Sequence, residues 1–378
     1  FGRFAAVERC LQLGARFVFG CGQLTQHQHL GAQRHGDVDV KARKAAVRLL
    51  EREGRIGAFD ADAQLDYALA QGVNFIDTAE MYAVPPSAET YGATERIIGD
   101  WLSRRGNRSD IVLATKMAGP GLDHVRAGAA MTPQTLLQAV DDSLQRLQTD
   151  YIDLYQLHWP NRVSPHFGKH AVGRINFSAI DAGEQTEQML GLLQALQQCV
   201  VAGKIRYCGL SNETPWGISQ YLQLSQKYAL PRMVSIQNEF SVLHRKDWPY
   251  LIEQCVHENI AYLPWSPLAG GALSGKYLNG ARPDGSRWSM LQRNGLFRDT
   301  PESNSAIAAF NELSYQHNIA PTTLALAWVN QVDGVSSTII GATSMAQLKA
   351  NIEAFSLTLD NALTSDLDSF LRQYPQPF

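Results

Sequence analysis

The chain has 378 residues, of which 45% are hydrophobic and 18% are charged, and its formal net charge is −3. This composition is typical of a globular protein with a large core, and the charge gives no indication of nucleic-acid binding. No apolar run approaches the roughly 20 residues of a membrane-spanning helix, so we expect no membrane span. The five cysteines form neither a CxxC pair nor a metal-binding spacing, which favours free thiols in a reducing cytoplasm.

Residues 1–57 differ in charge from the rest of the chain. They carry 10 Lys and Arg against 5 Asp and Glu, whereas the remainder carries 23 against 31. We interpret them as an atypical basic N-terminal extension that is poorly ordered or non-native, or else a tail for an acidic partner, and residues 58–378 as one domain. Within this extension, the apolar residues of 41–53 have helical spacing, which predicts one amphipathic helix.

From residue 58 onward, helical and strand-like patterns alternate. Several helical patterns stop at a glycine, as at Gly72, Gly106 and Gly203, which is typical of helix ends. Helices are expected at 60–71, 94–105, from 133 onward, 187–202, 216–228, 245–259, 301–317, 322–331 and from about 344, before a tail that ends at Phe378. Strands are expected at 73–77, 111–116, 151–158, 205–211, 233–237, 260–265 and 337–341.

Three of the predicted strands carry a polar residue at their end. Asp77, Lys116 and His158 occupy these positions, and Tyr82 follows Asp77 by five residues. Alternating strands and helices predict a parallel sheet, and such sheets place their chemistry at the carboxyl ends of the strands. The spacing therefore predicts that the four side chains point into one polar pocket.

These four residues, in this order, resemble the catalytic tetrad of the aldo-keto reductases. The stretches Ala79-Glu-Met-Tyr-Ala-Val-Pro-Pro86 and Trp265-Ser-Pro-Leu268 resemble most closely the branch of the bacterial Tas-like proteins, which is related to potassium-channel β-subunits. The resemblance covers roughly residues 60–378. It implies a (β/α)₈ TIM barrel, a fold of about 250 residues or more.

Seven predicted strands are one short of that barrel, so its first strand is divergent or missing. The only candidate upstream is the apolar run at 16–24, which has two glycines but carries Gln23 where the family has a threonine. An open barrel would leave two unpaired sheet edges, which soluble proteins rarely tolerate.

The resemblance implies reduction of an aldehyde or ketone to an alcohol with NADPH as hydride donor. Tyr82 would be the general acid that donates a proton to the carbonyl oxygen. A phenol ordinarily has a pKa near ~10, which a neighbouring cation lowers; Lys116 would be that cation and Asp77 would hold it. His158 would hydrogen-bond the carbonyl oxygen and orient the substrate.

No GxGxxG motif follows a strand, so a Rossmann dinucleotide site is unsupported. The resemblance instead implies an NADPH site on the barrel rim. An arginine fork suits the 2′-phosphate of NADPH, and Arg287 matches that contact. The backbone near a helix N-terminus, as after Gly341, suits phosphate. The residues implied in cofactor binding are Ser211, Asn212, Gln237, Trp265, Ser266, Pro267, Leu268, Gly270, Lys276, Arg287, Gly341, Thr343, Gln347 and Asn351.

Candidate walls of the substrate pocket are Met81, Met117 and Trp159, together with Ala83 and the loop 161–184. Their apolar character would suit aromatic or medium-length aliphatic aldehydes. We expect a small-molecule carbonyl substrate, no nucleic-acid partner, and either a monomer or a homo-oligomer.

Two alternatives remain open at the level of sequence. The first is a nucleotide-binding regulatory subunit of the channel β-subunit type, in which partner binding matters more than turnover. The second is a damaged reductase whose N-terminal segment cannot close the barrel.

Overall fold

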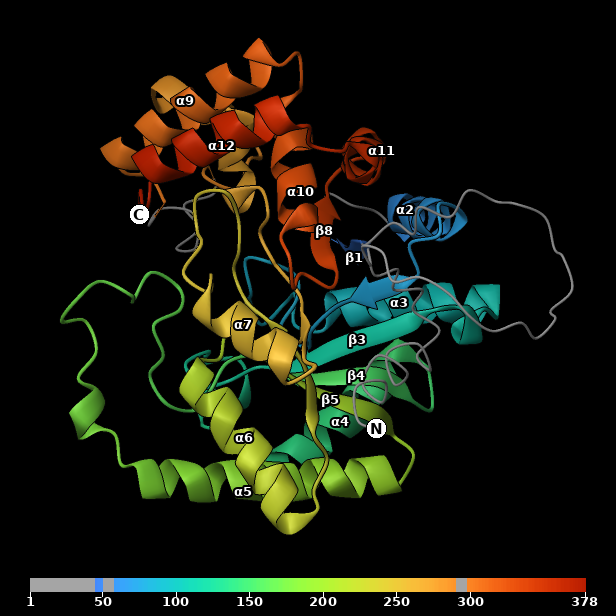
Figure 1. Cartoon of the computed structure of the whole chain (residues 1–378). Coiled ribbons are helices and arrows are strands. Elements are labelled where there is room, and N and C mark those ends of the chain that lie inside the picture. The colour runs from blue at the N-terminus through green and yellow to red at the C-terminus, as the bar shows by residue number, and fades with distance from the viewer. Residues whose placement is uncertain (1–44, 50–57, 290–297) are drawn as a thin grey trace, which may run out of the picture.

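The computed structural model describes residues 45–49, 58–289 and 298–378, which form a parallel eight-stranded sheet with surrounding helices (Figure 1). The strands are β1 (Ala45–Leu49), β2 (Phe75–Asp77), β3 (Val112–Met117), β4 (Ile152–Leu157), β5 (Ile205–Ser211), β6 (Met233–Gln237), β7 (Ala261–Tyr262) and β8 (Thr338–Ala342). The longer helices are α2 (Ala58–Ala70), α3 (Ala93–Arg105), α4 (Pro133–Leu147), α5 (Ala182–Val201), α6 (Pro215–Tyr228), α7 (Tyr250–His257), α9 (Pro301–Gln316), α10 (Pro321–Gln331), α11 (Met345–Glu353) and α12 (Asn361–Gln373).

The sheet closes on itself. Its strands follow the order β7-β6-β5-β4-β3-β2-β1-β8, and all neighbouring pairs are parallel. The two end strands also meet, because the backbone N–H of Ser336 donates to the carbonyl of Tyr262 (2.9 Å) and that of Ile339 donates to Pro264 (2.8 Å). These bonds complete the ring, which confirms the (β/α)₈ barrel.

β1 lies where we expected an amphipathic helix over 41–53, and that expectation is wrong. Val47 pairs with Ile76 of β2 on one side and with Ile340 of β8 on the other. Two flanking ladders satisfy the backbone hydrogen-bonding groups of this short segment on both edges. The pairing with β2 and β8 outweighs the local preference for a helix, because intrinsic helix propensity is weak.

β1 therefore supplies the strand that the sequence pattern lacked. It occupies the place between β2 and β8 that a first strand needs. The candidate at 16–24 lies outside the described residues. The division of the chain at residue 57 stays a prediction.

Two further elements differ from expectation. Helix α7 begins at Tyr250 instead of residue 245, because Pro249 has no N–H and disfavours helical backbone in the residue before it. Helix α12 was not expected. Its Leu367 and Phe370 are buried in a hydrophobic cluster shared with Phe310 of α9, so α12 covers that helix outside the β/α repeat (Figure 1).

Several helix starts follow directly from the sequence. A threonine side chain accepts a hydrogen bond from the first turn of each helix, and a proline comes next, at Thr132-Pro133, Thr214-Pro215 and Thr300-Pro301. Across the described parts of the chain, none of the helices is long and apolar enough to cross a membrane.

Side chains alternate along each strand between the barrel interior and the surrounding helices. On β3, Val112 and Ala114 belong to an interior cluster, whereas Leu113 belongs to the core between sheet and helices. Toward the carboxyl ends the interior becomes polar, and Asp77 and Lys116 are completely buried there. The barrel thus has an apolar layer beneath a polar one, and the polar layer lies where barrels carry their chemistry.

Candidate active site

The structure brings the four predicted chemical residues together at the carboxyl ends of three neighbouring strands. Asp77 ends β2, Lys116 lies near the end of β3, and His158 directly follows β4. Tyr82 lies on the loop after β2 and is 4% exposed. Because β2, β3 and β4 are adjacent in the sheet, residues at their ends share one part of the barrel rim.

Lys116 and Asp77 form a buried ion pair. The ammonium Nζ of Lys116 donates to both carboxylate oxygens of Asp77, each at 2.7 Å, and to the carbonyl oxygen of Thr78 at 2.7 Å. Gln237 donates to the same carboxylate through Nε2 at 2.9 Å. Both charged side chains are 0% exposed. Each charge is therefore paired and hydrogen-bonded, as burial requires.

Tyr82 and His158 face each other above this pair. The hydroxyl of Tyr82 lies 3.5 Å from Nε2 of His158, and their rings are 5.6 Å apart with an edge-to-face angle of 80°. The ammonium of Lys116 lies 5.4 Å from the centroid of the Tyr82 ring. A phenol, an imidazole and a fixed cation thus converge on one point, which suits proton transfer to a bound oxygen.

The loop that carries Tyr82 is held by Glu80, a residue whose role sequence reasoning missed. Its carboxylate is completely buried and accepts hydrogen bonds from the backbone N–H of Ala118 (2.7 Å), the hydroxyl of Tyr91 (2.9 Å) and the guanidinium of Arg126 (3.0 Å). Burial, together with the charge of Glu80, raises the pKa of Tyr91 well above its usual value. The sequence does indicate this residue, because Glu80 stands between the apolar residues Ala79 and Met81. A carboxylate buried at such a position must have charged or hydrogen-bonding partners.

Four of the residues implied in cofactor binding, Ser211, Asn212, Gln237 and Trp265, form one hydrogen-bonded group, in which the amide of Asn212 also donates to the hydroxyl of Ser211 at 3.0 Å. The amide of Asn212 donates to the carbonyl oxygen of His158 at 2.9 Å, and the indole of Trp265 donates to Oδ1 of Asn212 at 3.2 Å. Ser211 donates to the carbonyl oxygen of Gln237 at 2.7 Å. These contacts join the ends of β4, β5 and β6 to the segment after β7.

The segment after β7 has a backbone suited to phosphate. Residues Ser266, Ala269, Gly270 and Gly271 have φ values of 57°, 49°, 69° and 92°. Left-handed residues next to right-handed ones can turn successive N–H groups toward one concavity that binds anions. Buried Pro267 and half-buried Leu268 lie within the same segment.

Two cations border this segment. A Cβ atom on Gly271 would lie 3.2 Å from Nζ of Lys276, and one on Gly270 would lie 3.6 Å from Cδ of Arg287. The glycines therefore leave space into which both side chains reach. Arg298, which sequence reasoning missed, is buried beside Gly270 and donates to Glu239 through Nε at 2.9 Å.

The remaining predicted cofactor residues lie where β8 passes into α11. The side-chain oxygen of Gln347 accepts from the backbone N–H of Thr343 at 2.9 Å and from its hydroxyl at 3.0 Å. Asn351 donates to the carbonyl oxygen of Gly341 at 3.3 Å. These bonds fix the N-terminus of α11, which Ser344 caps.

The predicted substrate residues do not all lie at the site. Met81 and Trp159 pack in the same cluster as Tyr82. The indole of Trp159 donates to the carbonyl oxygen of Pro120 at 3.0 Å. Met117 is completely buried in the core between sheet and helices, because the residue after inward-facing Lys116 faces outward.

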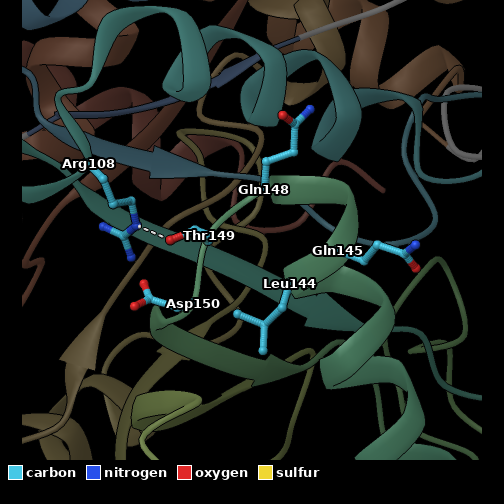
Figure 2. A pocket seen from close by; sticks show the side chains of 6 residues that line it. All are labelled: Arg108, Leu144, Gln145, Gln148, Thr149 and Asp150. Carbon is cyan, nitrogen blue, oxygen red and sulfur yellow. Dashed lines mark hydrogen bonds between the residues drawn. The ribbon is translucent and has the colours of Figure 1, made fainter.

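A surface hollow lies at the opposite ends of the strands. Figure 2 shows its lining of Arg108, Leu144, Gln145, Gln148, Thr149 and Asp150, which come from the end of α4 and the segments before β3 and β4. Arg108 donates to Thr149 at 3.1 Å and to Asp153 at 2.7 Å. Its charge is therefore used to join two strand starts, far from the tetrad.

Comparison with known proteins identifies the family to which the chain belongs. The family model described as "Aldo/keto reductase family" matches residues 47–372. "Protein tas" of Escherichia coli (strain K12) is 42% identical over 321 residues, which covers 84% of this chain and 91% of that protein. "Aldo-keto reductase" of Babesia bovis is 37% identical over 259 residues (65% and 89%), and "Uncharacterized oxidoreductase YrpG" of Bacillus subtilis (strain 168) is 28% identical over 319 residues (83% and 86%). The chain therefore belongs to the aldo/keto reductase family, a family of oxidoreductases.

Proposed function

We propose that this protein reduces aldehyde or ketone carbonyls to alcohols with NADPH, and that Tyr82 is the general acid. The observation that supports this most directly is the position of the Tyr82 hydroxyl, 3.5 Å from Nε2 of His158 and beside the buried Lys116–Asp77 pair. Two groups able to hydrogen-bond one oxygen atom thus lie next to a fixed positive charge.

The residues present fit the cofactor. In the segment after β7, residues Ser266, Ala269, Gly270 and Gly271 have left-handed backbone, and Lys276 and Arg287 reach into the space beside the two glycines. Such an arrangement favours a pyrophosphate and an additional phosphate group. When bound, NADPH supplies the hydride. Trp265, anchored through its indole N–H to Asn212, would hold the nicotinamide, together with Asn212 and Gln237.

The remaining chemistry belongs to the chain itself. Tyr82 donates its hydroxyl proton to the carbonyl oxygen, while His158 hydrogen-bonds that oxygen and fixes its direction. Lys116 stabilises the negative charge left on the Tyr82 oxygen, and Asp77 keeps Lys116 in place. The burial of Tyr82 excludes water and strengthens these electrostatic interactions.

The test is reduction of 4-nitrobenzaldehyde by the purified chain, followed by the loss of NADPH absorbance. Tyr82→Phe removes only the acidic hydroxyl, so we expect kcat to fall by about 10²-fold or more while NADPH titration by tryptophan fluorescence is unchanged. Tyr315→Phe on α9, where the ring is 61% exposed, is the matched control and should keep full activity. Equal activity of Tyr82→Phe and wild type would disprove the assignment.

A further inference from the structure

Three aromatic rings from three separate segments form a continuous row that begins beside His158. Trp159 follows β4, Phe167 lies on the loop before α5, and Trp265 follows β7. The centroid of the Phe167 ring lies 6.1 Å from that of Trp159, at an edge-to-face angle of 87°, and 6.1 Å from that of Trp265, at 30°. Phe167 therefore bridges the two tryptophans.

The two ends of this row are firmly held. Trp159 donates to the carbonyl oxygen of Pro120, and its ring lies 5.0 Å from that of His158. It also packs so closely on Gly119 that a Cβ there would meet its Cδ1 atom, which makes the glycine necessary for this position. Trp265 donates to Asn212. One end of the row thus adjoins the proton-donating side of the site, and the other adjoins the proposed nicotinamide side.

Phe167 itself is in an unfavourable backbone conformation. Its φ is +57°, a left-handed value that is a genuine outlier for a bulky residue. Such a conformation persists only where the surroundings impose it. The half-buried ring takes no part in the hydrophobic clusters that the described residues form, so core packing does not explain its position.

We propose that Phe167 determines substrate specificity by covering the substituent of the reacting carbonyl. This inference rests on the proposed function, which places the carbonyl at Tyr82 and His158, beside the end of the row that Trp159 forms. Flat rings stack favourably on other aromatic rings, whereas a short alkyl chain gains little from such a surface. Phe167 thus favours carbonyl compounds with a planar aromatic substituent over small aliphatic aldehydes.

The experiment compares Phe167→Ala with Phe177→Ala. Phe177 lies on the same loop, but its side chain is 63% exposed. We expect Phe167→Ala to lower kcat/KM for 4-nitrobenzaldehyde by about tenfold, the size of one lost aromatic contact, while kcat/KM for propanal and NADPH binding stay within about twofold of wild type. Phe167→Leu keeps an apolar side chain without the ring and should show the same selective loss. Phe177→Ala should change neither substrate. Equal losses on both aldehydes, or no loss on either, would overturn the proposal.

A binding measurement separates this proposal from the proposed function. If the wild type reduces no aldehyde, the function fails, yet the role of Phe167 can still be decided by titrating the NADPH-loaded protein with 4-nitrobenzyl alcohol and following tryptophan fluorescence. Binding about tenfold weaker in Phe167→Ala than in Phe177→Ala supports the proposal. Equal binding in the two variants rejects it.

Discussion

The buried Lys116–Asp77 pair makes a strong prediction about stability. Because both side chains are 0% exposed, Asp77→Leu leaves an unpaired ammonium and Lys116→Met leaves an unpaired carboxylate. Removing one partner of such a pair costs about 3–5 kcal/mol of unfolding free energy. If the losses of the two single variants were independent, they would add to about 6–10 kcal/mol. The double variant buries no charge. It leaves only the carbonyl of Thr78 and the amide of Gln237 without a partner, at about 1–3 kcal/mol each.

We therefore expect the double variant to lose about 2–6 kcal/mol. The midpoints of the two ranges, about 8 and about 4 kcal/mol, give a coupling energy of about 4 kcal/mol between the two sites. Urea unfolding of the wild type, both single variants and the double variant measures this coupling. The matched control is the cycle Lys204→Met with Asp141→Leu, a pair whose side chains are 40% and 48% exposed. That cycle should give less than about 1 kcal/mol. Additive losses at Lys116 and Asp77 would refute the reasoning.

The same four proteins separate stability from chemistry. All three variants should lack carbonyl reduction, because Lys116→Met and the double variant lack the cation beside Tyr82 and Asp77→Leu removes the carboxylate that holds it. The double variant should nevertheless be folded at low urea. A folded but inactive double variant would show that the pair is retained for chemistry, since apolar residues can replace buried ion pairs without large loss of stability.

Two further predictions concern pH. Burial raises the pKa of Asp247 to about 6, although the hydrogen bonds that its carboxylate accepts from Tyr262 and Asn238 act to lower it. Its contribution to stability is thus complete below about pH 4 and lost as the pH rises through 6, so Asp247→Asn should be about 1–3 kcal/mol more stable than wild type at pH 7.5 and equal to it at pH 4. Burial lowers the pKa of His166 to about 4. The contribution of His166 to stability is complete above pH 6.5 and is lost as the pH falls toward 4. When the pH falls from 7.5 to 4, the unfolding free energy of His166→Gln should therefore decrease by about 1–3 kcal/mol less than that of the wild type. Urea unfolding at both pH values checks each difference, and a difference that does not vary with pH would contradict either one.

Much of the barrel could be predicted from periodicity. Seven strands lie where short apolar runs between helical patterns indicated them, because most of their residues are buried between the barrel interior and the helices. The eighth, β1, could not be found in this way. Its five residues also fit a helical spacing, and only the neighbouring ladders of β2 and β8 decide between the two conformations.

The residues of the site likewise fall into those that the strand pattern predicts and those that depend on how loops pack. Asp77, Lys116 and His158 follow from their places at strand ends, once the sheet is known to be parallel. Glu80 and Arg126, which hold the loop of Tyr82, are separated by 46 residues and have no shared sequence pattern. Their pairing depends on how two loops meet above the barrel, which local spacing does not encode.

Met117 on a strand and Phe167 on a loop show how these two kinds of position affect the site. Met117 follows Lys116 directly, yet a step of one residue along a strand moves a side chain to the opposite face, so Met117 packs against helices. Phe167 lies nine residues beyond His158, yet its loop returns the ring to Trp159 and Trp265. Strand ends thus place Asp77, Lys116 and His158, whereas loops place Tyr82 and, in our proposal, the ring of Phe167 that covers the substrate. Substitutions in the loop before α5 should therefore change which carbonyl compound is accepted, and substitutions at the strand ends should change whether any is reduced.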